Sequence, residues 1–235
     1  MITCEDLNVS YDKKTIISRF SFVFKPGNVY ALIGPNGVGK STLLKALSGF
    51  LPYDGHVQLK GKDLDRYSIK DLSRIMAICN TRKPMLSGFK CREVVQMGRL
   101  PYGGGNPEIV EQSMAIMGVD KIADHSVDSI SDGQMQKVML ARALAQDTLF
   151  LLLDEPSTFL DLDAKTELFQ VLANWAKNKN RIVIYSTHEV LSALSYVDSF
   201  LLMQSSKVET HLSSDLLDSH SFQSTFPKFS QNRSK

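Results

Sequence analysis

The stretch that decides the fold is Val29-Tyr30-Ala31-Leu32-Ile33, followed by Gly34-Pro35-Asn36-Gly37-Val38-Gly39-Lys40-Ser41-Thr42. The first five residues form a continuous apolar run, which is typical of a buried parallel strand. Leu43, Leu44 and Leu47 then share one face of a predicted helix. The residues between fit the pattern G-x-x-x-x-G-K-[ST], whose glycines let backbone N–H groups approach phosphate oxygens closely. The sequence therefore predicts a loop that binds the phosphates of a nucleoside triphosphate.

Two side chains of this loop have predicted roles of their own. Lys40 is expected to reach the β- and γ-phosphates, and Ser41 is expected to ligate Mg²⁺. The N-terminus of the following helix adds the positive end of a dipole, which favours an anion at the same place.

Acidic residues and a histidine follow two further apolar runs. Leu149–Leu153 leads directly into Asp154 and Glu155, and Ile182–Tyr185 is followed closely by His188. Because ligands of α/β proteins bind at the carboxyl ends of parallel strands, we expect these side chains near the phosphate loop. Asp154 suits the Mg²⁺ shell, Glu155 suits a general base that activates water, and His188 suits a contact to the γ-phosphate.

The order of elements predicts an α/β protein with a parallel sheet, because apolar strands alternate with helices. The first thirty residues are rich in β-branched and aromatic residues and are predicted to form strands. A mostly helical segment is expected at about 83–145, with a helix that starts at Asn106-Pro107-Glu108 and stops at Gly118. The last residues are polar, so we expect a principal domain at 1–215 and a tail at 216–235.

A second helix start also has the character of an anion site. Ser131-Asp132-Gly133-Gln134 stands immediately before the predicted helix Met135–Ala145. The phosphate loop already has its own helix, so two such starts in one chain suggest two chains that share nucleotides across an interface.

Together these motifs resemble the ATP-binding cassette (ABC) ATPases. Ser131–Gln134 stands where that family has its LSGGQ signature, and Pro156–Asp161 resembles its D-loop, which ends in Asp161. His188 matches the switch histidine, and Tyr11 matches the aromatic residue that stacks on adenine. For Tyr11 the alternative is an ordinary tyrosine at a strand edge.

The resemblance implies a RecA-like P-loop NTPase core, an N-terminal antiparallel β subdomain and an inserted helical subdomain. It implies ATP and Mg²⁺ as ligands and a head-to-tail dimer in which ATP lies between one copy's phosphate loop and the other's signature. It also implies membrane permease subunits as partners and a peripheral position on the cytoplasmic face of the cell membrane.

One segment resembles a narrower group. Glu93-Val94-Val95-Gln96-Met97-Gly98-Arg99-Leu100-Pro101-Tyr102 is similar to the segment ending GRxPY in importers of iron-siderophore, haem and cobalamin chelates. Those importers work with an extracytoplasmic substrate-binding protein. The alternative is that the segment belongs to importers generally.

Two positions depart from the family pattern. The position where the family usually has the glutamine of its Q-loop is Thr81, beside Asn80, and neither has a glutamine's reach. Asp132 replaces a signature glycine, and a carboxylate facing the γ-phosphate of a second copy would repel it. We therefore expect the Asp132 side chain to turn outward.

The composition of the chain disfavours several classes of function. A formal net charge of +2, from 27 basic and 25 acidic residues, gives no general attraction to nucleic acid, and none is expected as a partner. The spacing of Cys4, Cys79 and Cys91 matches neither a zinc site nor a CxxC pair, so reduced thiols are expected. The N-terminus has no apolar region of a signal peptide, and no apolar stretch approaches the roughly 20 residues of a membrane span.

Two other functions remain open. One is a soluble ABC-type ATPase that acts on ribosomes or DNA, which the single cassette and near-neutral charge disfavour. The other is a nucleotide-binding scaffold with weak turnover, which Lys40, Asp154, Glu155 and His188 disfavour. The predicted function is the ATP-hydrolysing subunit of an ABC importer.

Overall fold

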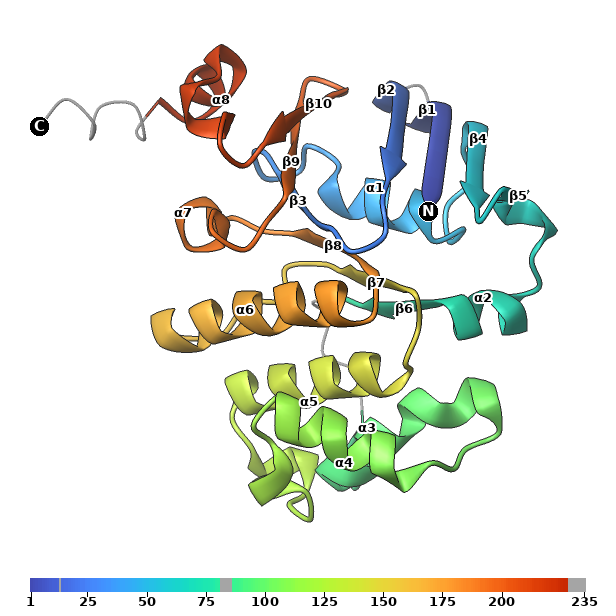
Figure 1. Cartoon of the computed structure of the whole chain (residues 1–235), viewed down its shortest axis with the longest axis vertical. Helices are drawn as coiled ribbons and strands as arrows, with labels where there is room; N and C mark the ends of the chain where they lie inside the picture. The colour runs from blue at the N-terminus through green and yellow to red at the C-terminus, as the bar shows by residue number, and fades with distance from the viewer. Residues whose placement is uncertain (13, 81–85, 228–235) are drawn as a thin grey trace, which may run out of the picture.

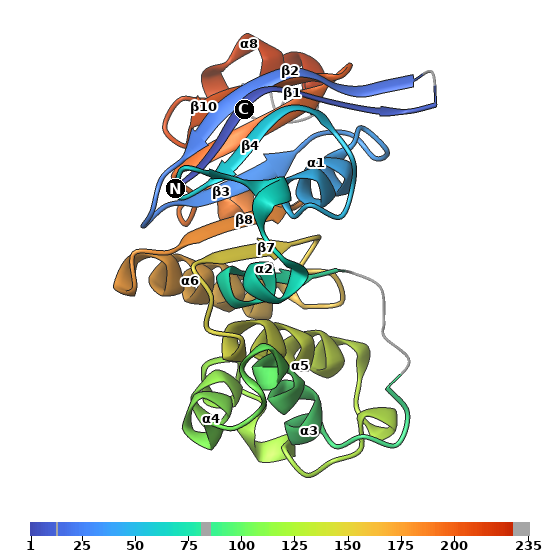
Figure 2. The same ribbon diagram turned by 90° about the vertical axis from the view of Figure 1, so that its right-hand side faces the viewer.

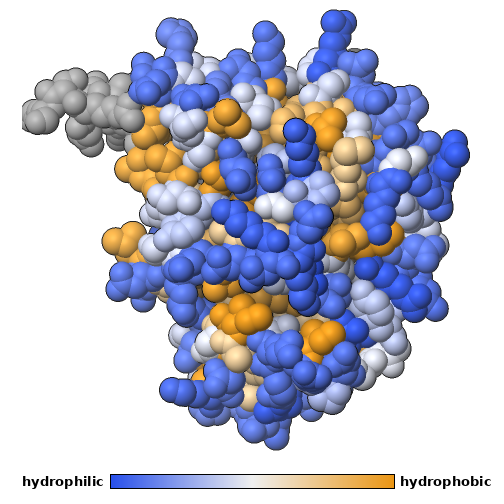
Figure 3. Space-filling model, in the orientation of Figure 1, coloured by the Kyte–Doolittle hydropathy of each residue, from blue (hydrophilic) through white to orange (hydrophobic). Residues whose placement is uncertain are grey.

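The computed structural model describes residues 1–12, 14–80 and 86–227. It contains two sheets and a helical lobe. In Figure 1 the N-terminal sheet stands at the upper right, the larger sheet runs from the top to the middle, and the lobe lies at the bottom. Within the described residues, no helix is long and apolar enough to cross a membrane. Figure 3 shows one face of the molecule as largely hydrophilic, with apolar side chains in separate areas.

The smaller sheet is antiparallel and is built from the N-terminal part of the chain. Its order is β2-β1-β4-β5. Its strands are β1 (Ile2–Tyr11), β2 (Lys14–Phe24), β4 (Asp54–Leu59) and β5 (Lys62–Asp63). On β2, Phe20 and Phe24 are buried whereas Ser21 and Val23 are exposed, so the alternation seen in the sequence sets the inward face. This confirms the predicted antiparallel β subdomain.

The larger sheet has the order β10-β9-β3-β8-β7-β6. Its strands are β3 (Val29–Ile33), β6 (Met76–Cys79), β7 (Phe150–Leu153), β8 (Ile182–Ser186), β9 (Ser199–Gln204) and β10 (Lys207–Leu212). All neighbours pair in parallel except β9 and β10. Every residue of β3, β7 and β8 is buried, as continuous apolar runs predict for strands covered on both faces.

Two hydrophobic clusters cover the two faces of this sheet. In β3, Tyr30 and Leu32 belong to the cluster shared with the antiparallel sheet, whereas Val29, Ala31 and Ile33 belong to the cluster shared with the helical lobe. The helices and 3₁₀ turns outside the lobe are α1 (Lys40–Leu47), η1 (Leu64–Arg66), α2 (Ile69–Ile75), α6 (Leu162–Asn178), α7 (Val190–Ala193), η5 (Leu216–Asp218) and α8 (His220–Thr225). Figures 1 and 2 show α1 between the two sheets and α6 between the larger sheet and the lobe.

The lobe is the inserted helical segment that the sequence predicts. Its elements are α3 (Cys91–Gln96), η2 (Met97–Tyr102), α4 (Pro107–Ile116), η3 (Asp120–Ile122), η4 (Val127–Ser129) and α5 (Asp132–Ala145). Asn106 caps α4 and Pro107 is its first residue, as predicted. The chain leaves the lobe at the C-terminal end of α5 and enters β7, so α5 joins the lobe to the sheet.

The segment after β10 includes the first part of the expected tail, 216–235. Leu216 and Phe222 are buried in the main cluster, with exposed fractions of 0% and 1%. Ser219 caps α8 by accepting a hydrogen bond from the backbone N–H of Phe222. Although this segment is mostly polar, two of its apolar residues pack on the core. The part of 216–235 that the structure describes is therefore docked on the larger sheet's hydrophobic cluster.

Candidate functional site

The phosphate loop lies between β3 and α1, as predicted. Gly34, Gly37 and Gly39 all have positive φ, of 148°, 75° and 117°. A Cβ at Gly34 would clash with the backbone oxygen of Met203, and one at Gly39 would lie 2.5 Å from Ile16 Cγ2. These glycines therefore allow a loop conformation and a close approach that other residues could not adopt.

Lys40 is the first residue of α1, and 6% of it is exposed. Its Nζ donates hydrogen bonds to the carbonyl oxygens of Gly34 and Pro35, at 3.0 and 3.2 Å. Burial lowers its pKa, and the charges of Glu155 and Asp154 partly oppose that shift. When a phosphate enters the loop, the Lys40 ammonium can exchange its hydrogen bonds to these carbonyls for hydrogen bonds to phosphate oxygens. Charged phosphate oxygens are the stronger acceptors.

The predicted acids lie at the carboxyl end of β7, and Ser186 of the neighbouring β8 joins them. Ser186 Oγ donates to Asp154 Oδ1 at 2.6 Å and accepts from the backbone N–H of Glu155 at 2.8 Å. Ser186 has no role among the residues predicted from the sequence. A hydroxyl directly after four apolar strand residues was the signal that could have identified it, because it comes out at the same sheet edge as the acids.

Glu155 and His188 form a pair. His188 Nε2 and Glu155 Oε1 are 2.8 Å apart, and both side chains are partly exposed. Glu155 has φ of 49°, a left-handed conformation that is uncommon for a residue with a side chain. Strain of this kind is found at active sites, where the surrounding structure holds it. Here the Ser186 hydroxyl holds the Glu155 backbone.

A cavity of about 340 Å³ lies beside α1 and brings together several predicted residues. Tyr11, Ser41, Asn80 and Asp154 are among the residues lining it. Tyr11 is 44% exposed at the end of β1, so an aromatic face is open there. A hydroxyl and a carboxylate on one cavity fit Mg²⁺, which binds few protein oxygens and keeps several waters. Thr81, the predicted Q-loop position, lies outside the described residues.

The predicted signature begins α5. Ser131 is the N-cap, and its Oγ accepts from the Gln134 backbone N–H at 3.2 Å, while Gln134 Oε1 accepts from the Ser131 N–H at 2.9 Å. Asp132 is exposed. None of Ser131–Gln134 is among the described residues lining the cavity beside α1. The structure of one chain thus leaves these two predicted parts of the nucleotide site separate.

The loop that follows the acids lies against the signature helix. A Cβ at Gly133 would lie 2.8 Å from the Phe159 carbonyl oxygen, and Gln136 Nε2 donates to the Pro156 oxygen at 3.1 Å. Asp161 ends this loop and caps α6 by accepting from the Ala164 N–H at 2.8 Å. The predicted D-loop is therefore packed between the acids and the start of α5.

The glycine-rich loop has a buried lysine at a helix start, and acids lie at the carboxyl end of β7 in the same largely parallel sheet. These features define a P-loop nucleotide-binding protein. Comparison with known proteins narrows this class. A profile of the family described as ABC transporter matches residues 17–158. The chain belongs to the ABC transporter family as an ATP-binding subunit, and ATP hydrolysis is its activity.

Individual relatives agree with this assignment. The iron(3+)-hydroxamate import ATP-binding protein of Bacillus subtilis is 34% identical over 203 residues, which are 83% of this chain and 76% of the relative. The hemin import ATP-binding protein of Escherichia coli O157:H7 is 34% identical over 216 residues, 88% of this chain and 84% of the relative. A solved ATP-binding cassette of an ABC transporter, in its ADP conformation, has a TM-score of 0.85 at 20% identity and covers 97% of this chain and 98% of its own. This likeness confirms the predicted fold.

Proposed function

We propose that this chain is the ATP-hydrolysing motor subunit of an importer for metal chelates of the iron-siderophore, haem or cobalamin type. Relatives named for hydroxamate and hemin import, each similar over more than four fifths of this chain, are the observation that carries the proposal. The segment Glu93–Tyr102, with its GRxPY ending, supports the same group.

The chemistry follows from the sheet edge. Glu155 is the general base that takes the proton of the attacking water, and His188, 2.8 Å away, orients Glu155 and then contacts the γ-phosphate. Lys40 stabilises the negative charge that develops on the phosphoryl oxygens. Tyr11 stacks on adenine at the open side of the cavity.

Mg²⁺ would be held by Ser41 and Asp154. When bound, it neutralises charge on the β- and γ-phosphates. Ser186 fixes the orientation of the Asp154 carboxylate by donating to Oδ1, so Asp154 presents its other lone pairs toward the cavity.

Two copies pair head to tail, and ATP on Gly34–Thr42 of one copy meets Ser131 and Gly133 of the other. Membrane permease subunits bind the dimer at the cytoplasmic face of the membrane, and an extracytoplasmic binding protein delivers the chelate to them. The separation of the two half-sites within one chain supports this arrangement, because each half completes the other only in a second copy.

The test is reconstitution with a membrane permease and a substrate-binding protein from the same organism. Purified chain, permease and binding protein are placed in liposomes, and ATP hydrolysis is measured with a ferric hydroxamate, with haem, with cobalamin and without a chelate. One chelate is expected to stimulate hydrolysis, and Glu155→Gln is expected to abolish it. Hydrolysis that no chelate alters in the complete system would contradict the importer function.

Thr81 takes the place of the Q-loop glutamine in this proposal and acts on the attacking water through another water molecule. Thr81→Gln is expected to change both the basal and the permease-stimulated rate. If both rates stay the same, the position has no part in coupling.

A further inference from the structure

The motif Gly98–Tyr102 lies in η2 and contacts the C-terminal end of α5. Arg99 is 7% exposed, and its Nη1 donates to the carbonyl oxygens of Ala145, at 2.9 Å, and of Gln146, at 3.4 Å. A cation at this end of a helix is favoured by the exposed carbonyls and the negative end of the dipole. Gly98 permits the approach, because a Cβ there would clash with the Arg142 carbonyl oxygen.

The same motif also reaches the core. Arg99 lies over the Tyr102 ring at 4.2 Å, and Arg74 of α2 lies over that ring at 5.7 Å. Tyr102 Oη donates to the Arg74 carbonyl oxygen at 3.1 Å, and Arg74 Nε donates to the Pro101 oxygen at 2.9 Å. The motif therefore connects α2, outside the lobe, to the end of α5.

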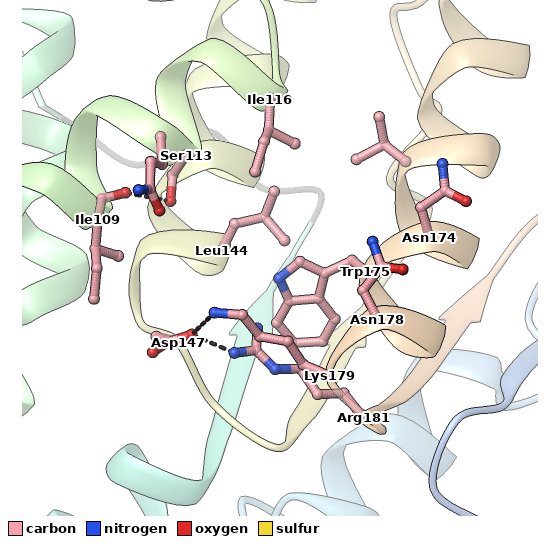
Figure 4. A pocket seen from close by; sticks show the side chains of 12 residues that line it. Ile109, Ser113, Ile116, Leu144, Asp147, Asn174, Trp175, Asn178, Lys179 and Arg181 are labelled. Carbon is pink, nitrogen blue, oxygen red and sulfur yellow. Dashed lines mark hydrogen bonds and ion pairs between the residues drawn. The ribbon is translucent and has the colours of Figure 1, made fainter.

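The residues directly after α5 are fixed to the core as well. Gln146 Nε2 donates to the carbonyl oxygens of Ser73 and Met76. Asp147 pairs with Lys179 and Arg181, and Arg181 lies over the Trp175 ring at 4.2 Å. Figure 4 shows these ion pairs at one end of a cleft, with Leu144 of α5 beside Trp175. Arg99 is thus one part of a joint at which the lobe meets the sheet.

Arg99 Nε is buried and has no hydrogen-bond partner among the described residues. A buried polar group without a partner is costly, and a residue that served only to stabilise the fold would not need one there. Met or Leu would fill the same space without that cost, but would remove the hydrogen bonds to the Ala145 and Gln146 carbonyls. A guanidinium also supplies a fixed planar geometry between the Tyr102 ring and these two helix carbonyls.

We propose that Arg99 is a positioning residue: it sets the angle of α5 and thereby places Ser131 and Gly133, at the other end of the helix, for ATP bound to a second copy. This inference rests on the proposed head-to-tail dimer. The 14 residues of α5 span about 20 Å, so a tilt of about 5° at Ala145 displaces Ser131 by about 2 Å. That displacement exceeds the roughly 0.5 Å range of hydrogen-bond lengths.

The test compares ATP-driven dimerisation in a background that cannot hydrolyse ATP. Glu155→Gln alone is expected to dimerise with ATP, as followed by sedimentation velocity. Adding Arg99→Ala is expected to raise the ATP concentration for half-maximal dimerisation roughly tenfold, as for a lost hydrogen bond, and Arg99→Lys roughly threefold. ATP affinity at a dilution where only monomer is present stays within about twofold, because Lys40 and Tyr11 lie outside the lobe.

The outcomes separate the two proposals. If Glu155→Gln does not dimerise with ATP, the proposed dimer fails. If it dimerises equally with and without Arg99→Ala, the role of Arg99 is overturned. Arg92→Ala is the matched control, because Arg92 is a partly exposed arginine of the same lobe whose ion pairs are with Glu111 and Asp124 and not with the end of α5. It is expected to leave dimerisation unchanged.

A distance measurement between the lobe and the sheet distinguishes a change in lobe orientation from a general loss of stability. Spin labels at Lys121→Cys and Lys207→Cys, both exposed positions, report on the lobe relative to the sheet. The native Cys4, Cys79 and Cys91 are buried and free, and burial raises the pKa of Cys4 to about 12 and of Cys79 to about 11, so they react slowly. Arg99→Ala, or Arg99→Lys if the alanine variant does not fold, is expected to broaden the distance distribution. An unchanged distribution overturns the inference.

Discussion

The two helix starts, α1 and α5, differ in what satisfies their first backbone N–H groups. The N-cap of α1 is Gly39, which offers no side chain, and its first turn holds no acid. The N-cap of α5 is Ser131, whose hydroxyl and the Gln134 side chain cap the helix reciprocally, and Asp132 stands in the first turn. The start of α1 is therefore left for an external anion, whereas that of α5 is largely satisfied by its own chain.

This difference shows how one chain could provide two separate halves of a nucleotide site, one at the start of α1 and one at the start of α5. Among the described residues no side chain caps the start of α1, which favours the binding of an anion there. The start of α5 is capped by its own chain. In the proposed dimer, it adds binding energy only when a second copy brings a nucleotide to it. The following predictions test that division.

Lys40→Ala is expected to have the largest effect, because it removes the cation of the α1 site. ATP hydrolysis should fall at least about 100-fold, as for the loss of a donor that stabilises transition-state charge. Steady-state hydrolysis and equilibrium binding of a fluorescent ATP analogue measure it. Lys70→Ala, at an exposed lysine of α2, is the control and should match the unmodified chain. Retained tight binding in Lys40→Ala would contradict the site.

Gly34→Ala tests the rigidity of the same loop. The new Cβ would meet the Met203 backbone oxygen at a φ of 148°, so the free energy of unfolding should fall by about 2–3 kcal/mol. Denaturant unfolding measures this. Gly61 has a positive φ of 78°, but no atom of the described residues lies within 4 Å of the Cβ that Gly61→Ala would add, so this change should cost about 1 kcal/mol. Equal costs would show that conformation alone, and not the close approach, requires Gly34.

Ser131→Asp separates capping from nucleotide binding at α5. Aspartate caps a helix as well as serine does, so stability should stay within about 0.5 kcal/mol of the unmodified chain. Its charge would repel a phosphate of the second copy, so ATP-driven dimerisation should weaken at least about tenfold. Ser131→Ala removes the cap and adds no charge. It should therefore lower the free energy of unfolding by about 1 kcal/mol without adding repulsion to the phosphate. Unweakened dimerisation in Ser131→Asp would remove α5 from the nucleotide site.

The parts of the fold and site that could be predicted from the sequence are those encoded by contiguous residues. The strand, glycines and helix around Lys40 are contiguous, and so are the strand and acids at Asp154, so their spacing shows their chemistry. The bridge from Ser186 to Asp154 depends on β8 lying beside β7, a long-range pairing that no local pattern encodes. The docking of Phe222 and the contacts of Arg99 are long-range in the same way.

The smallest expected effect concerns the far end of α5, where Asp147 pairs with Arg181 and Lys179. Burial raises the pKa of Asp147, but the hydrogen bond and charge of Arg181 outweigh it and hold the pKa below its usual range. Because the folded-state pKa is the lower one, the pair stabilises the fold above a pH of about 4 and loses that effect as pH falls through the folded-state value.

Asp147→Asn should therefore lower the free energy of unfolding by about 1–2 kcal/mol at neutral pH, and the difference should shrink as the pH is lowered below about 4. Urea unfolding across that pH range measures it. Asp124→Asn, at an exposed aspartate of the lobe, is the control and should show little difference at any pH. Because α5 is held at this end by Arg99 and Gln146 as well, Asp147→Asn should leave ATP-driven dimerisation nearly unchanged. A loss as large as that of Ser131→Asp would instead make Asp147 the principal fixed point of the helix.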